Sequence, residues 1–279
     1  MVHAEHRRTV LITGAGSGIG RAIAARPARS GFHVIGTTRD AAAATALEET
    51  ARAGGWPVRI LPLELTSPDS IRALTERVAA AGGVDILVLN AGHGVFGAIE
   101  DVDAHLVARQ FAVNLLGPLE LTRQLLPGLR ERQGRVIWIG SLAGRISLPF
   151  QAHYSATKAA IAAVSDALRI ELRPHGVRVT CIEPGDFATQ FTAARTVVAP
   201  PGSAYRDAQE RCLTAVVAQE QSGPAPEWVA RIVEGVCRQT RPPARRPVGR
   251  LARTMCFVLR LLPDRVRERI VRSHYAQSG

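Results

Sequence analysis

The sequence predicts an α/β fold: a doubly wound parallel sheet with helices on both faces, in a single domain over residues 1–249, with a helical tail over residues 250–279. Three observations predict it. Short β-branched runs alternate with helical patterns along most of the chain. A glycine-rich turn follows the first of these runs. The 279-residue chain is 46% hydrophobic but only 5% aromatic, so small apolar side chains are available for close packing of helices on a sheet.

Seven runs are expected to be strands, at residues 8–13, 33–37, 59–63, 85–89, 135–140, 177–183 and 245–248. Helices are expected at residues 21–30, 41–53, 69–81, 103–130 and 227–239, and around Tyr154 and Lys158. This alternation implies right-handed crossovers and a parallel sheet covered on both faces. Pro27 is expected to kink or shorten the first helix, because it removes a donor and clashes with the carbonyl of Ile23.

The alternation is lost over residues 191–226, which hold Pro, Gly, Ala and scattered apolar positions. A long segment of this kind in a compact domain is typical of a lid, so we expect a substrate lid at about residues 186–226.

The cellular setting is read from what the sequence lacks. The first residues lead directly into a strand-like run and no run is long and apolar enough to span a membrane, so we expect neither a secretory signal nor a transmembrane helix. The four cysteines, Cys181, Cys212, Cys237 and Cys256, have neither disulfide-scaffold nor zinc spacing. We therefore expect a cytoplasmic protein without a metal site.

The formal charge of +11 is concentrated in the tail, because residues 241–279 contain ten arginines and only two acidic residues. Leu251, Met255, Val258, Leu259 and Leu262 form a helical apolar stripe there, and Val266, Ile270 and Val271 begin a second one after Pro263. Such a basic amphipathic tail can contact an anionic membrane surface, or it can pack on its own or a neighbouring subunit. Few aromatic residues accompany the arginines, which argues against nucleic-acid binding.

The glycine-rich turn is a candidate dinucleotide site. Gly14, Gly18 and Gly20 follow the first strand and open a helix. Glycines there let the backbone approach a pyrophosphate, which binds at the helix N-terminus where unpaired N–H groups favour an anion.

The end of the second strand bears on the choice of dinucleotide. Arg39 favours the 2′-phosphate of NADP(H), whereas the adjacent Asp40 is the residue type that binds the ribose of NAD(H). We expect NADP(H) to be preferred. NAD(H), with Arg39 as a solvated loop charge, remains the alternative.

A tyrosine and a lysine form the candidate reaction site. Tyr154 and Lys158 are spaced i, i+4, so on a helix they share a face. Of the 35 basic Lys and Arg residues, Lys158 is the only lysine, which indicates that its compact ammonium group is needed there. A neighbouring ammonium favours the phenolate, so we expect the pKa of Tyr154 to lie below its usual value of about 10.

Three polar residues accompany this pair. Asn90 closes the fourth strand and Ser141 follows the fifth, at the carboxyl edge of the sheet where ligands of this architecture bind. Asn114 lies among apolar residues within a helix, where its amide needs a partner. It either contributes to the site or forms a structural bridge to a nearby loop.

These motifs together resemble the short-chain dehydrogenase/reductase family over residues 9–248: Thr13-Gly-Ala-Gly-Ser-Gly-Ile-Gly20, Asn90-Ala-Gly92, Asn114, Ser141, Tyr154-x-x-x-Lys158 and Pro184-Gly185. The runs preceding Tyr154 and following Cys181 are similar to the branch with 17β-hydroxysteroid and retinol dehydrogenases. The resemblance implies a Rossmann-type fold, an oxidoreductase that interconverts carbonyl and alcohol, and a homodimer or homotetramer paired through the helices that begin near Asp103 and Ala152.

The resemblance also implies roles for individual residues. Tyr154 is the general acid/base, Ser141 binds the carbonyl oxygen, Lys158 holds the nicotinamide ribose and Asn114 anchors a proton-relay water. The implied dinucleotide contacts are Gly14, Ser17, Gly18, Ile19, Gly20, Arg39, Glu64, Leu65, Asn90, Ala91, Gly92, Tyr154, Lys158, Pro184, Gly185 and Thr189. Glu64 stands where the family usually has aspartate.

The expected substrate is apolar, such as a steroid, a retinoid or another lipid, because Leu148, Pro149, Phe150, Phe187 and Phe191 are expected to flank the opening. No basic residue other than Arg145 is obviously placed for a carboxylate. A catalytically silent dinucleotide sensor is the alternative, against which the complete Ser, Tyr, Lys and Asn set argues.

Overall fold

A seven-stranded parallel sheet forms the centre of the molecule, in the order β3-β2-β1-β4-β6-β7-β9. The computed structural model describes residues 7–189, 194–249 and 262–275. The strands are β1 (Thr9–Ile12), β2 (His33–Thr38), β3 (Arg59–Pro62), β4 (Ile86–Leu89), β6 (Arg135–Ile139), β7 (Arg178–Pro184) and β9 (Arg245–Val248). All seven lie where the sequence predicts strands. The order reverses between β1 and β4, which brings the carboxyl ends of these strands to a ligand-binding crevice.

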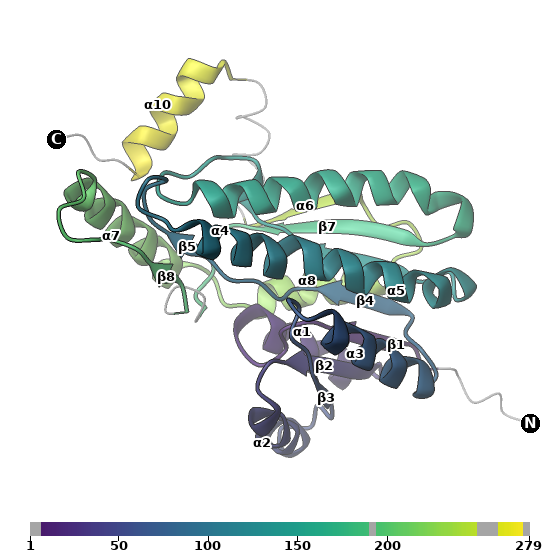
Figure 1. Ribbon diagram of the computed structural model, residues 1–279. Coiled ribbons are helices and arrows are strands. Elements are labelled where there is room, and N and C mark those ends of the chain that lie inside the picture. The colour runs from purple at the N-terminus through teal and green to yellow at the C-terminus, as the bar shows by residue number, and fades with distance from the viewer. Residues whose placement is uncertain (1–6, 190–193, 250–261, 276–279) are drawn as a thin grey trace, which may run out of the picture.

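Helices cover both faces of the sheet (Figure 1). They are α1 (Gly18–Arg29), α2 (Ala41–Ala53), α3 (Pro68–Ala80), α4 (Ala104–Phe111), α5 (Gly117–Glu131), α6 (Ala152–Glu171), α7 (Arg206–Ser222), α8 (Glu227–Arg238) and α10 (Asp264–Tyr275). Short 3-10 turns, η2 (Leu142–Gly144) and η3 (Arg173–His175), lie before and after α6.

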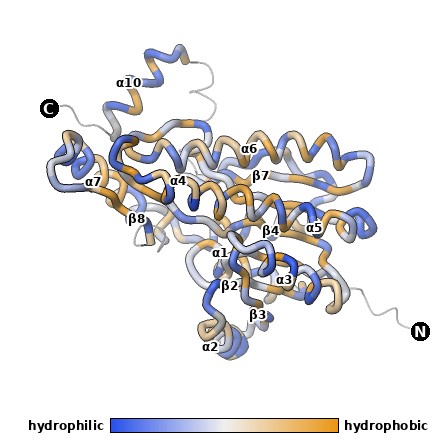
Figure 2. Tube along the Cα trace, viewed as in Figure 1, coloured by the Kyte–Doolittle hydropathy of each residue, from blue (hydrophilic) through white to orange (hydrophobic). Residues whose placement is uncertain are grey.

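The two faces form separate apolar cores because alternate residues of each strand point in opposite directions. Val10 and Ile12 of β1 join Ile23 of α1 and Val233 of α8 in one core. Leu11, between them, belongs to the other core with side chains of α3, α5 and α6. Strand β4, which consists of four buried apolar residues, shows this most clearly (Figure 2).

The prediction that Pro27 shortens the first helix is wrong. Helix α1 continues through Pro27 and ends two residues later at Arg29. Pro27 lies in the last turn of α1, where little helix remains to be disrupted, and its side chain is buried. Its own carbonyl still accepts hydrogen bonds from the N–H groups of Ser30 and Phe32.

The long helix predicted over residues 103–130 is interrupted by a π-helical segment. This segment, η1 (Ala112–Leu116), joins α4 to α5 and contains Asn114. A single π turn inside an α-helix displaces one side chain from the regular 3.6-residue repeat, and such turns are frequent at functional sites.

The segment expected to be a lid contains regular structure that the sequence did not reveal. Strand β8 (Thr196–Val197) pairs with β5 (Val95–Phe96) in a separate two-stranded sheet, and α7 follows. Figure 1 shows α7 and β8 beyond the carboxyl end of the main sheet. Both elements therefore lie over the edge at which the site residues gather.

Of the first predicted stripe, only Leu262 is among the described residues, and Leu251, Met255, Val258 and Leu259 lie outside them. The second apolar repeat is confirmed as α10, which contacts α7. Val266 and Ile270 on this helix remain 41% and 36% exposed. None of the helices in the described part of the chain has the length and apolar character needed to cross a bilayer.

Candidate functional site

The glycine turn between β1 and α1 is shaped by close approaches that only glycine allows. Gly14 and Gly18 have φ values of 69° and 51°, in the left-handed region that glycine adopts without strain. A Cβ atom on Gly20 would lie 2.0 Å from the carbonyl oxygen of Gly14. The turn therefore presents bare backbone at the start of α1, which suits a pyrophosphate.

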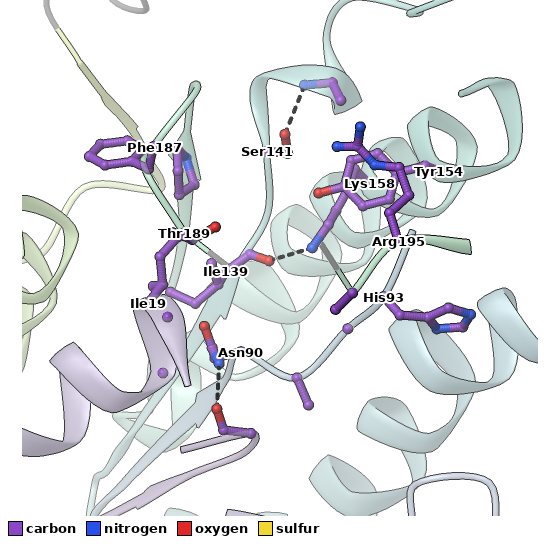
Figure 3. A pocket seen from close by; sticks show the side chains of 18 of the residues that line it. Ile19, Asn90, His93, Ile139, Ser141, Tyr154, Lys158, Phe187, Thr189 and Arg195 are labelled. Atoms are coloured by element: carbon purple, nitrogen blue, oxygen red, sulfur yellow. Dashed lines mark hydrogen bonds between the residues drawn. The ribbon is translucent and has the colours of Figure 1, made fainter. Parts of the chain in front are cut away.

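Asn90 ties the end of β4 to this turn. Its Nδ2 donates to the carbonyl oxygens of Thr13 and Gly14, at 3.0 Å and 3.2 Å. Its backbone N–H donates to the hydroxyl of Thr13. The asparagine thus fixes the conformation of the glycine turn, and Figure 3 shows it on the floor of the cavity.

Ser141, Tyr154 and Lys158 meet at the other end of the same cavity (Figure 3). Ser141 follows β6 and its Oγ accepts from the backbone N–H of Ala143 at 3.0 Å. Tyr154 lies in the first turn of α6, and Lys158 follows one turn later. The ammonium nitrogen of Lys158 lies 5.6 Å from the centre of the Tyr154 ring and donates to the carbonyl oxygen of Ile139 at 2.9 Å.

The prediction of a lowered tyrosine pKa is wrong for this structure. Burial raises the pKa of Tyr154 to about 12, against the lowering effects of a hydrogen bond with Ser141 and the charge of Arg195. Burial also lowers the pKa of Lys158 to about 8. The Tyr154 ring is partly exposed to the cavity, so access of water there reduces the effect of burial. Desolvation, which the i, i+4 spacing does not report, outweighs both lowering effects.

Asn114 forms the structural bridge that was one of its two predicted roles. Its Oδ1 accepts from the backbone N–H of His93, and its Nδ2 donates to the His93 carbonyl and to Oγ1 of Thr157. Asn114 is the one predicted site residue that does not line the cavity. Its three bonds instead hold the loop after β4 against α6.

The residues after β2 and β3 have separate roles. Arg39 is exposed and lines the cavity, whereas Asp40 caps α2 by accepting from the backbone N–H groups of Ala42 and Ala43. Glu64 also lines the cavity, but its Oε1 accepts from the backbone and hydroxyl of Thr66. Burial acts to raise the pKa of Glu64, yet those bonds and the charges of Arg39 and Arg109 hold it below the usual value.

One cavity of about 1260 Å³ joins these parts. Every residue predicted to contact the dinucleotide lines it: Gly14, Ser17, Gly18, Ile19, Gly20, Arg39, Glu64, Leu65, Asn90, Ala91, Gly92, Tyr154, Lys158, Pro184, Gly185 and Thr189. Several lining residues were missed, among them His93, Arg109, Gln151, Arg195 and Glu220. Arg195 and Glu220 come from the segment in which no elements were predicted. Gln151 is the residue that directly precedes α6, three residues before Tyr154, so its closeness in sequence to Tyr154 was the usable signal.

The apolar wall predicted near Tyr154 is only partly present. Leu148 and Phe187 line the cavity, but Pro149 and Phe150 do not, and Phe191 lies outside the described residues. The ring of Phe150 instead packs against Phe96, with 6.0 Å between ring centres.

Besides Lys158, the basic residue that lines the cavity near Tyr154 is Arg195, and not Arg145 as considered from the sequence. The guanidinium of Arg145 is bonded to the carboxylate of Glu183, which is 2% exposed.

A glycine turn fixed by Asn90, open to the same cavity as Tyr154 and Lys158, defines the class of nicotinamide dinucleotide-dependent oxidoreductases. Comparison with known proteins identifies the family. The short chain dehydrogenase family matches residues 8–197, and the chain belongs to this family.

Three relatives illustrate the likeness. A 3-ketodihydrosphingosine reductase of Bacteroides thetaiotaomicron is 32% identical over 272 residues, covering 96% of this chain and 97% of the relative. The mouse 17-beta-hydroxysteroid dehydrogenase type 1 is 38% identical over 215 residues, covering 74% of this chain and 62% of the relative. The crystal structure of a short-chain dehydrogenase from Streptomyces avermitilis superposes with a TM-score of 0.82 at 31% identity, covering 96% of both chains.

Proposed function

We propose that this short-chain dehydrogenase is an NADP(H)-dependent enzyme that interconverts a ketone or aldehyde with an alcohol on an apolar, lipid-like substrate such as a steroid or retinoid. The observation that carries the proposal is the single cavity lined by both the glycine turn and the trio Ser141, Tyr154 and Lys158. A dinucleotide bound along the turn would reach this trio with its other end.

The roles of these side chains in carbonyl reduction follow from the hydrogen-bond and proton donors that they carry. The bound nicotinamide supplies the hydride in reduction, and the protein supplies position and proton transfer. Tyr154 donates its proton to the carbonyl oxygen. The Ser141 hydroxyl accepts from Ala143 and is hydrogen-bonded with Tyr154, so it lies beside the proton donor, where it can stabilise the developing negative charge on that oxygen.

Lys158 is equipped to hold a ribose. One of its three N–H donors is used by the Ile139 carbonyl, which leaves two for ribose hydroxyls. Asn114 supports the lysine indirectly, because it fixes His93 and Thr157 beside α6. The proton relay through water that the family resemblance implies for Asn114 is part of this proposal.

The preference for NADP(H) rests on Arg39, Asp40 and Ser17. Because the Asp40 carboxylate caps α2, it is engaged away from the ribose 2′-position. Arg39 and Ser17 line the cavity, and the Ser17 hydroxyl makes no capping bond within α1. A guanidinium and a hydroxyl suit a phosphate group.

Two further features support the substrate class and the assembly. The reaction end of the cavity has an apolar wall formed by Leu142, Ile146, Leu148, Phe187 and Val216, and two relatives are named for 3-ketodihydrosphingosine and for a 17-beta-hydroxysteroid. Leu116 and Ile170 are 57% and 75% exposed, which supports a homodimer or homotetramer through the helices beside them. The contact of α10 with α7 supports packing of the tail on the protein over membrane contact.

A carbonyl panel tests the proposal. Purified protein is supplied with NADPH or NADH and with a steroid ketone, retinal, a long-chain aliphatic ketone and a ketose sugar, and dinucleotide absorbance is followed. We expect faster turnover with NADPH and with the apolar carbonyls. Turnover of none of them would contradict the assigned activity, and a preference for the sugar would contradict the substrate class. If light scattering shows that the purified protein is a monomer, the proposed homodimer or homotetramer is contradicted.

A further inference from the structure

A buried ion pair lies at the reaction end of the cavity. Arg195, just before β8, is 7% exposed, and its Nη2 lies 2.5 Å from Oε1 of Glu220 on α7. The guanidinium also lies over the ring of Phe96, 5.7 Å from its centre. Arg195 and Glu220 both line the cavity together with Tyr154, and Figure 3 shows Arg195 beside the tyrosine.

A buried ion pair between two elements carries a large desolvation cost. Removing two charges from water costs several kcal/mol per ion, and their attraction recovers this only with good geometry. An apolar contact would connect the β8 segment to α7 at lower cost. The pair differs from an apolar contact in placing one charge of each sign beside a phenol that has to ionise.

The other charged groups around Tyr154 come from two elements. Lys158 is on the same helix and is bonded to the Ile139 carbonyl, and Asp186 follows β7. Burial is the largest influence on the pKa of Tyr154 and raises it, and hydrogen bonding with Ser141 lowers it. Among the charges, Arg195 lowers this pKa, while Glu220 and Asp186 raise it. Burial lowers the pKa of His93, elsewhere in the cavity, and the charges of Arg109 and Arg39 lower it further.

We propose that Arg195 and Glu220 are positioning residues that set, with opposite signs, the pH at which Tyr154 exchanges its proton. This deepens the proposed function and rests on it for the role of Tyr154. Arg195 stabilises the phenolate, and Glu220 holds the guanidinium in place while opposing part of its effect. The two residues therefore act through Tyr154 and need not touch the substrate.

The first test follows ionisation directly. The tyrosinate absorbance of each protein is titrated with pH, and the signal that disappears in Tyr154→Phe is assigned to Tyr154, since the chain has only three tyrosines. We expect Arg195→Gln to move the midpoint upward and Glu220→Gln to move it downward. Arg195→Lys, which keeps the charge, is expected to restore the wild-type midpoint.

The second test uses alcohol oxidation, which requires the phenolate. The substrates are NADP⁺ and the alcohol that corresponds to the carbonyl reduced fastest in the panel. The kcat/KM for oxidation is expected to rise with pH as Tyr154 ionises. Arg195→Gln is expected to move this rise to higher pH, and Glu220→Gln to lower pH. If Arg195→Gln does not fold, two variants still test the inference. Glu220→Gln is expected to shift the midpoint, and Arg195→Lys is expected to keep the wild-type midpoint.

A second ion pair provides controls, although its Arg26 side chain is 41% exposed, against 1% for Arg195. Arg26 and Glu234 join α1 to α8 at 2.5 Å, and the Glu234 carboxylate side chain is 12% exposed, against 14% for Glu220. Neither residue lines the cavity, so Arg26→Gln and Glu234→Gln are expected to leave the midpoint unchanged. If the Tyr154 midpoints of the Arg195→Gln and Glu220→Gln variants do not shift, or shift in the same direction, the inference is overturned. The ion pair would then only join the β8 segment to α7. A wild type without turnover would instead refute the proposed function, and the absorbance titration would still decide the ionisation.

Discussion

Replacing Gly20 with alanine is expected to damage both the fold and dinucleotide binding. The added Cβ would lie 2.0 Å from the carbonyl oxygen of Gly14 and 2.5 Å from Nδ2 of Asn90, whereas such contacts need at least 3.0 Å. The turn or helix α1 must therefore move by about 1 Å, and overpacking of this kind costs about 1–3 kcal/mol. The displacement also threatens the two bonds from Asn90 Nδ2, each worth about 0.5–1.5 kcal/mol. We expect a loss of about 2–5 kcal/mol of unfolding free energy.

Urea unfolding followed by tryptophan fluorescence measures this loss, and NADPH titration measures the weakened affinity. The matched control is Gly128→Ala, since a Cβ at this helical position meets nothing within 4 Å. This variant is expected to gain about 0.5–1 kcal/mol and to bind NADPH normally. A Gly20→Ala protein with wild-type stability and affinity would refute the close approach of α1 to the turn.

Two further predictions concern the dinucleotide and the buried lysine. Arg39→Leu is expected to raise the KM for NADPH by about 10–100-fold while leaving that for NADH nearly unchanged, whereas Asp40→Ala is expected to lose about 0.5–2 kcal/mol of stability with little change in either KM. Equal effects of Arg39→Leu on both dinucleotides in steady-state assays would contradict the assignment. Because burial lowers the pKa of Lys158 to about 8, the folded state at pH 7 carries the cost of a buried charge, on the order of 3 kcal/mol. Lys158→Met removes this cost but leaves the Ile139 carbonyl without its donor, so we expect an inactive protein about 2 kcal/mol more stable in urea at pH 7. Its advantage is expected to vanish as the pH rises from about 8 through 10.5, above which wild-type Lys158 is neutral in both states; an advantage independent of pH would contradict the lowered pKa.

The sheet was predictable because its signals are local. A parallel strand buried on both faces is a short apolar run, as residues 86–89 illustrate, and the glycines of the turn are tied to backbone approaches that no other residue permits. The same locality explains the success at Tyr154 and Lys158, since helical spacing alone places them on one face.

What the sequence could not give depends on contacts between distant segments. Helix α7 has charged and apolar residues without a clear stripe, because its few buried side chains, such as Cys212, face the small core around Phe96. Arg195 and Glu220 are 25 residues apart and meet only when β8 pairs with β5. The raised pKa of Tyr154 likewise arises from burial, which residue spacing does not report.

Reduction of an apolar ketone by the wild type and by Tyr154→Phe tests the central claim most directly, with NADPH affinity measured separately for both proteins. The account predicts that the variant binds NADPH as the wild type does but turns over about 10²–10⁴ times more slowly, because only the proton donor has been removed. Undiminished turnover by Tyr154→Phe would contradict the assignment of this cavity as the site of carbonyl reduction.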